Sequence, residues 1–164
     1  MDEPGPSVNH VGICVSDLER SRRFYTGALG FRPWWELDVP DGSAGPLLRL
    51  PTPLGTHATY LANGRFVLEL IHYRDHPATA PPGGRAMDVL GLTHLSVAVE
   101  DVAAAADAVE ALGGEVLRDT AVGAAAVMVR DPDGQLLELT STGFPAMRPP
   151  WPDGPDGPDG RPPA

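Results

Sequence analysis

The chain has 164 residues, of which 42% are hydrophobic, enough for one ordinary domain or two small modules around a core. Its net charge of −10 without any basic cluster argues against nucleic acid or an anionic membrane as a partner. Lysine is absent, which excludes Schiff-base chemistry, and Cys14 is the only cysteine, which excludes an intrachain disulfide. No signal pattern opens the sequence and no apolar run approaches ~20 residues, so we expect a cytoplasmic protein.

The first half of the chain predicts a strand, a helix and then further strands. The apolar run over 8–15 reads as a buried strand. Ser16, with Glu19 three residues later, resembles a capping box for a helix over 17–29, and Gly30 fits its end. Asn63-Gly64 is a strong hairpin signal. Strands are expected near 31–39, 46–51, 56–62 and 66–73.

The second half repeats the first at an offset of 84 residues. The stretch "NHVGICVSDLERSRRFYTGALGF" aligns with "THLSVAVEDVAAAADAVEALGGE", and "NGRFVLEL" echoes "DGQLLEL". A strand over 92–99, a helix capped by Asp101, and strands near 115–118, 121–130 and 135–141 follow. We therefore predict an α+β fold of two tandem βαβββ modules with curved, cup-like mixed sheets. The expected modules are 7–75 and 92–142, joined by a Pro- and Gly-rich connection over 76–91 and followed by a disordered Pro-Asp-Gly-rich tail over 145–164.

Two polar pairs occupy corresponding positions of the two modules. His10 matches His94 in the first strand of each module, and Glu69 matches Glu138 in the last strand. A single histidine in such a strand is usually a satisfied core residue, but an unpaired carboxylate among apolar residues is costly. A divalent cation between the sheets would satisfy all four side chains together, so this pattern indicates a metal site.

These motifs resemble the vicinal oxygen chelate superfamily, which includes glyoxalase I, methylmalonyl-CoA epimerase, extradiol dioxygenases, fosfomycin-resistance enzymes and bleomycin-binding proteins. The resemblance rests on "HVGICVSDLERSRRFYTGALGF", "LTHLSVAVEDV" and "VRDPDGQLLELTS" and covers about residues 7–142. Carried over to this sequence, the family's ligands fall on His10, Glu69, His94 and Glu138. The resemblance implies one divalent metal per site, which is Ni, Co, Zn, Mn or Fe.

A His/Glu/His/Glu set leaves two positions of an octahedron, which suits one bidentate substrate and resembles glyoxalase I and methylmalonyl-CoA epimerase. The resemblance implies a metal-dependent isomerase, epimerase or lyase that shifts an α-proton of a small carbonyl substrate through an enediolate. Glu138 is our candidate for the base, with Glu69 as its counterpart; alternatively, both remain ligands throughout. Two other functions stay open: an iron-dependent, extradiol-type dioxygenase with Glu69 off the metal, and a non-catalytic protein that sequesters a drug or metabolite.

Several other residues have both a functional and a structural interpretation. Cys14 would line the site or pack as a small hydrophobe, and Trp34 and Trp35 would cover a substrate or pack in the core or an interface. Arg49 and Arg130 would hold an anionic substrate or carry surface charge. His57, His72 and His76 have no counterpart in the other module and are left out of the site. We expect a homodimer because paired modules leave sheet edges exposed, with the site either within one chain or across the dimer.

Overall fold

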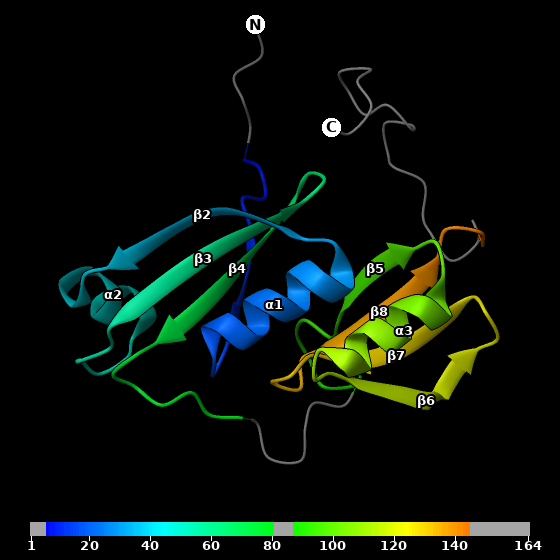
Figure 1. Cartoon of the computed structure of the whole chain (residues 1–164). Helices are drawn as coiled ribbons and strands as arrows, with labels where there is room; N and C mark the ends of the chain where they lie inside the picture. The colour runs from blue at the N-terminus through cyan, green and yellow to red at the C-terminus, as the bar shows by residue number, and fades with distance from the viewer. Residues whose placement is uncertain (1–5, 81–86, 145–164) are drawn as a thin grey trace, which may run out of the picture.

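The computed structural model describes residues 6–80 and 87–144 and confirms two tandem βαβββ modules, each with one four-stranded mixed sheet (Figure 1). The sheets have the strand orders β1-β4-β3-β2 and β5-β8-β7-β6, in which β1–β4 and β5–β8 pair in parallel and the other pairs are antiparallel. The predicted tail and residues 81–86 of the predicted connection lie outside the described residues. The first module contains β1 (Val11–Cys14), α1 (Leu18–Leu29), β2 (Arg32–Val39), α2 (Asp41–Leu48), β3 (Thr56–Asn63) and β4 (Phe66–Tyr73). The second module contains β5 (Leu95–Val99), α3 (Val102–Ala111), β6 (Glu115–Val122), β7 (Ala126–Arg130) and β8 (Leu136–Ser141).

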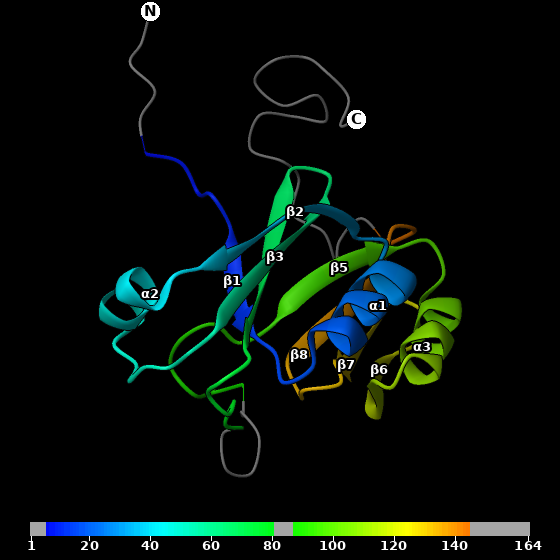
Figure 2. The same cartoon turned by 60° about the vertical axis from the view of Figure 1, so that its left-hand side comes forward.

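Two of the predicted strands are wrong. The segment expected as a strand near 46–51 contains no strand: residues 46–48 belong to α2 and residues 49–51 follow it. Helix α2 stands at the far end of the first sheet from α1 and α3 (Figure 2). Pro46 has no N–H to donate to a neighbouring strand. The Asp41 carboxylate, at the start of α2, accepts hydrogen bonds from the backbone N–H groups of Leu54 and Gly55 and so connects the helix to the segment that follows it. The single strand expected over 121–130 is divided, because Gly123 turns the chain with a φ of 55° between β6 and β7.

The helix termini follow the predicted chemistry with one shift. Asp17, and not Ser16, is the N-cap of α1, since its carboxylate accepts a hydrogen bond from the Arg20 N–H at 2.9 Å. Gly30 ends α1 with a φ of 68°, as predicted. The predicted cap of α3 is confirmed as well, because Asp101 accepts from the Ala104 N–H at 3.0 Å. No helix in residues 6–80 or 87–144 has the length and apolar character needed to span a membrane.

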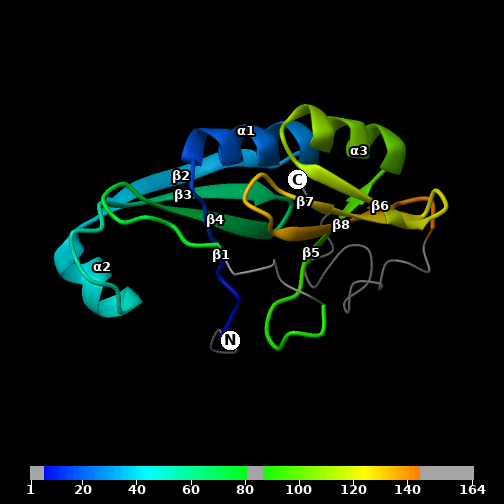
Figure 3. The same ribbon diagram turned by 90° about the horizontal axis from the view of Figure 1, so that it is seen from below.

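One hydrophobic core joins the two modules. Helices α1 and α3 lie side by side and cover the same side of both sheets (Figure 3). Phe24 and Tyr25 of α1 are fully buried in the same cluster as Val109 and Val129 of the second module. The backbone approaches closely at Gly114, where a Cβ atom would lie 2.8 Å from a ring carbon of Phe24. The helices therefore occupy one face of each sheet and leave the opposite face open.

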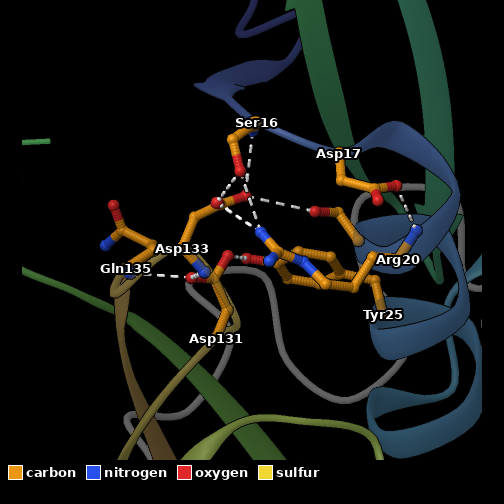
Figure 4. Close-up of polar contacts among 8 residues, drawn as sticks. Ser16, Asp17, Arg20, Tyr25, Asp131, Asp133 and Gln135 are labelled. Atoms are coloured by element: carbon orange, nitrogen blue, oxygen red, sulfur yellow. Dashed lines mark hydrogen bonds and ion pairs between the residues drawn. The ribbon is translucent and has the colours of Figure 1, made fainter. Parts of the chain in front are cut away.

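A polar network reinforces this contact between the modules (Figure 4). The Asp133 carboxylate, in the turn between β7 and β8, accepts hydrogen bonds from Ser16, Arg20 and Ser21 at the N-terminal end of α1. Burial alone would raise the pKa of Asp133, but the hydrogen bonds from Ser16 and Arg20 bring it below its usual value. The hydroxyl of Tyr25 donates a hydrogen bond to the neighbouring Asp131 at 2.8 Å. Burial raises the pKa of the Asp131 carboxyl. The network thus ties the second module to the first helix.

Candidate metal centre

His10 and Glu69 form a close pair, which we call the first half-site. His10 lies immediately before β1, on the open side of the sheet, and not inside a buried strand as expected. Its Nε2 is 3.1 Å from Oε2 of Glu69 in β4, and the two side chains are 33% and 13% exposed. Gly12 stands opposite Glu69 in the parallel ladder, and a Cβ atom there would lie 3.0 Å from the same oxygen. A residue without a side chain thus leaves room for the carboxylate.

His94 and Glu138 form the corresponding second half-site. His94 lies immediately before β5, and its Nε2 is 3.7 Å from Oε2 of Glu138 in β8. Their side chains are 27% and 24% exposed, so this carboxylate is more open to solvent than that of Glu69. Ser96 takes the place of Gly12 opposite the glutamate. The sequence repeat therefore places a histidine and a glutamate in the same arrangement in both modules.

A second feature is shared by both histidines. The Nδ1 atom of His10 is 2.6 Å from Oδ1 of Asn9, and that of His94 is 3.0 Å from Oγ1 of Thr93. A proton on Nδ1 donated to these oxygens leaves the Nε2 lone pair directed at the carboxylate, the arrangement usual for histidine ligands of metals. Sequence reasoning missed Asn9 and Thr93, although a polar residue precedes the histidine in both copies and was a visible signal.

The donor chemistry and spacing of the first half-site fit a divalent metal. Two ligand atoms about 2.1 Å from a metal in adjacent octahedral positions lie about 3.0 Å apart, close to the separation of His10 and Glu69. Imidazole nitrogen and carboxylate oxygen are suitable donors for Mn, Fe, Co, Ni and Zn. Within the described residues the four predicted ligands lie as two pairs on separate sheets, and nowhere do three or more His, Cys, Asp or Glu side chains gather around one point. The four-ligand set therefore stays a prediction.

The strand register places a row of side chains across the open face of each sheet. In the first sheet the row runs Gly12, Glu69, Tyr60, Trp35, and in the second it runs Ser96, Glu138, Met128, Leu117.

Aromatic residues distinguish the first row. Tyr60 donates a hydrogen bond to Oε1 of Glu69 at 2.8 Å, and burial together with this carboxylate raises the pKa of Tyr60 to about 12. Trp35 stacks on Tyr60 with ring centroids 5.3 Å apart, and an irregularity of β2 brings Trp34 to the same ring. Both indoles are more than half exposed, so they are not core residues. The hairpin predicted at Asn63-Gly64 turns one residue later, at residues 64–65, and this register places Tyr60 opposite Glu69.

The remaining candidates lie elsewhere or have other partners. Cys14 is exposed, and desolvation with the nearby Asp133 raises the pKa of its thiol. Arg49 is exposed and ends α2 with a φ of 57°, while Arg130 lies 3.7 Å from Glu115. Among the histidines left out, His57 interacts with Asp38, His72 faces His57 across β3 and β4, and His76 contacts the ring of Tyr73.

Two βαβββ modules that share a core and leave open sheet faces define the vicinal oxygen chelate class of fold. Residues 7–139 match the model of the Glyoxalase/Bleomycin resistance protein/Dioxygenase superfamily, and the chain belongs to this superfamily.

Several known proteins are similar to this chain. A chloroplastic protein of Arabidopsis thaliana, named a probable lactoylglutathione lyase, is 31% identical over 82% of this chain. The match covers 35% of that relative, so this chain spans less than half the length of the plant protein. A glyoxalase family protein of Bacillus cereus shares the fold with a TM-score of 0.72 and 18% identity, covering 85% of this chain and 95% of that one. The fosfomycin resistance protein FosX of Listeria monocytogenes, in complex with Mn(II) and a dihydroxypropylphosphonic acid, gives a TM-score of 0.56 and 13% identity, covering 82% and 91%.

Proposed function

We propose that this protein is a metal-dependent enzyme of the glyoxalase type, a lyase or isomerase that moves an α-proton in a small carbonyl substrate. The observation that carries the proposal is the duplicated His/Glu pair, with imidazole and carboxylate atoms 3.1 and 3.7 Å apart in the two half-sites. The similarity to a plant protein named as a lactoylglutathione lyase supports the reaction class, and the Mn(II) complex of FosX supports a divalent metal.

The site is completed, in this proposal, by a second copy of the chain. Each half-site offers two ligands, whereas a catalytic metal generally takes three or more from protein. The half-site residues lie beside exposed apolar side chains, because Val8 and Leu92, each two residues before a histidine, are 89% and 70% exposed. Apolar surface at such positions is typical of a face that another protein copy covers. The first half-site of one chain would then meet the second half-site of its partner in a homodimer.

The residues of a completed site have distinct tasks. A bound divalent metal would supply polarisation of the substrate carbonyl. His10, Glu69, His94 and Glu138 would hold that metal, with Asn9 and Thr93 orienting the imidazoles. Glu138 would take the α-proton on a carboxylate oxygen while the C–H electron pair shifts toward the carbonyl oxygen, and would then return the proton to the neighbouring carbon. The longer separation of Glu138 from its histidine supports its assignment as the base.

Metal analysis with matched variants tests the proposal. The tag-free protein is stripped with chelator, reloaded with Ni, Co, Zn, Mn or Fe, and compared with Glu69→Ala and Glu138→Ala. Glu100→Ala, which removes an exposed glutamate away from both half-sites, is the control. We expect one metal per site in the wild type and the control, weakened binding in both half-site variants, and turnover of a hemithioacetal or an acyl-CoA epimer by the loaded wild type.

Two results would contradict this function in different ways. Failure of the wild type to take up any metal would indicate a non-catalytic binding protein. Iron retained by Glu69→Ala but lost by Glu138→Ala, with oxygen consumption on a catechol, would indicate a dioxygenase.

A further inference from the structure

We infer that Tyr60 is a positioning residue for Glu69: its hydroxyl fixes one carboxylate oxygen and thereby presents the other to the metal. The inference rests on the proposed function, because it concerns how this chain holds one of the ligands.

The two oxygens of Glu69 have different partners. Oε1 accepts the hydrogen bond of the Tyr60 hydroxyl at 2.8 Å, and Oε2 lies 3.1 Å from Nε2 of His10. A carboxylate can bind a metal through one oxygen or through both. With Oε1 engaged by a hydroxyl, Oε2 is the oxygen left beside the imidazole. Glu69 is therefore oriented to bind a metal through Oε2 alone.

The ring of Tyr60 is itself held from two sides. Trp35 stacks on it at 5.3 Å with an interplanar angle of 28°, and the ring of His10 meets it nearly at right angles, also at 5.3 Å. The antiparallel register of β3 and β4 places Tyr60 directly opposite Glu69. Strand pairing and ring packing thus hold the Tyr60 hydroxyl within hydrogen-bonding distance of the Glu69 carboxylate. Little conformational freedom is therefore lost when the hydrogen bond forms.

The second half-site has no such donor. Met128 faces Glu138 at the position that corresponds to Tyr60, and a thioether has no hydrogen to donate. Among the described residues, Glu138 accepts no side-chain hydrogen bond, and its Oε2 is 3.7 Å from His94. The two half-sites are consequently unequal: Glu69 is a fixed ligand, whereas Glu138 keeps the freedom that a proton-transferring carboxylate needs.

The test removes only the hydroxyl and measures metal binding. Tyr60→Phe keeps the ring and its packing on Trp35, and Met128→Leu is the matched control at the same position of the other half-site. Each chelator-stripped protein is titrated with Co(II), with the dissociation constant and the visible spectrum of the bound metal as readouts and the melting temperature recorded in parallel. Loss of an outer partner of a metal ligand typically weakens metal binding about 10-fold to 100-fold.

We expect Tyr60→Phe to bind Co(II) about tenfold more weakly, with an altered visible spectrum and a melting temperature close to that of the wild type. Met128→Leu should bind as the wild type does. Equal binding and equal spectra for the wild type and Tyr60→Phe would overturn the role of Tyr60 and leave the proposed function standing. Absence of Co(II) binding by the wild type would overturn the proposed function and the role of Tyr60 together.

Discussion

The Asp133 carboxylate, in the turn between β7 and β8, contributes to the contact between the modules, and replacing Asp133 with Asn tests that contribution. The Asp133 side chain is 19% exposed and accepts hydrogen bonds from Ser16, Arg20 and Ser21. The ion pair with the partly exposed Arg20 contributes at most about 1 kcal/mol. Weakening the hydrogen bond from the buried Ser21 adds roughly another 1 kcal/mol. We therefore expect a loss of about 2 kcal/mol and a melting temperature lower by about 4–8 °C.

The pH dependence of this loss has a definite sign. The pKa of Asp133 in the folded chain lies below its ordinary value. A carboxyl of this kind contributes stability that is fully present above its unfolded pKa of about 3.9 and is lost as the pH falls through the folded pKa. The difference in unfolding free energy between the wild type and Asp133→Asn should stay constant between pH 8 and pH 5. It should shrink only below about pH 4.

Urea unfolding at several pH values measures the difference, and Asp107→Asn is the control because Asp107 is exposed on α3. Equal unfolding free energies for Asp133→Asn and the control at pH 7 would refute the reasoning. So would a difference that had already vanished by pH 5.

Two glycine substitutions separate packing from metal binding. At Gly114 a Cβ atom would lie 2.6 Å from a backbone oxygen, so Gly114→Ala should reduce the unfolding free energy by about 1–3 kcal/mol in a urea titration. Gly42 lies in open space on α2, so Gly42→Ala should not destabilise the chain in the same titration. At Gly12 the added methyl would press on Oε2 of Glu69, so Gly12→Ala should weaken Co(II) binding. Ser96 is the equivalent position of the second half-site, and Ser96→Ala should leave Co(II) binding unchanged. Unweakened binding by Gly12→Ala would show that the carboxylate adapts.

The sequence contained the repeat, and the repeat was enough to predict the architecture. An offset of 84 residues aligned both histidines and both helices, and the motifs "NGRFVLEL" and "DGQLLEL" matched the two glutamates, because periodic apolar positions and turn residues are local signals. A hairpin near Asn63-Gly64 was also predictable from its residue types, but the structure pairs Asn63 with Phe66, so the turn lies one residue later than predicted.

The features that sequence reasoning missed depend on contacts between distant segments. Ser16 was expected to cap a helix, but its hydroxyl binds Asp133, which is 117 positions away. Residues 46–48 of the strand expected near 46–51 lie instead in α2, whose first residue, Asp41, accepts hydrogen bonds from two backbone N–H groups beyond the helix. The irregularity in β2 that brings Trp34 onto the ring of Tyr60 depends on pairing with β3 and has no signature within β2 itself.

The central claim is that one metal site combines the first half-site of one chain with the second half-site of another, and a mixing experiment tests it most directly. One chain carries His10→Ala and Glu69→Ala, and a differently tagged chain carries His94→Ala and Glu138→Ala. The two are co-expressed and the mixed dimer is purified through both tags.

The claim predicts that neither variant alone binds Co(II) tightly and that the mixed dimer regains one metal, since it contains one intact pair of half-sites. A mixed dimer that binds no metal, beside a wild type that binds it fully, would contradict the claim and indicate that each site forms within a single chain.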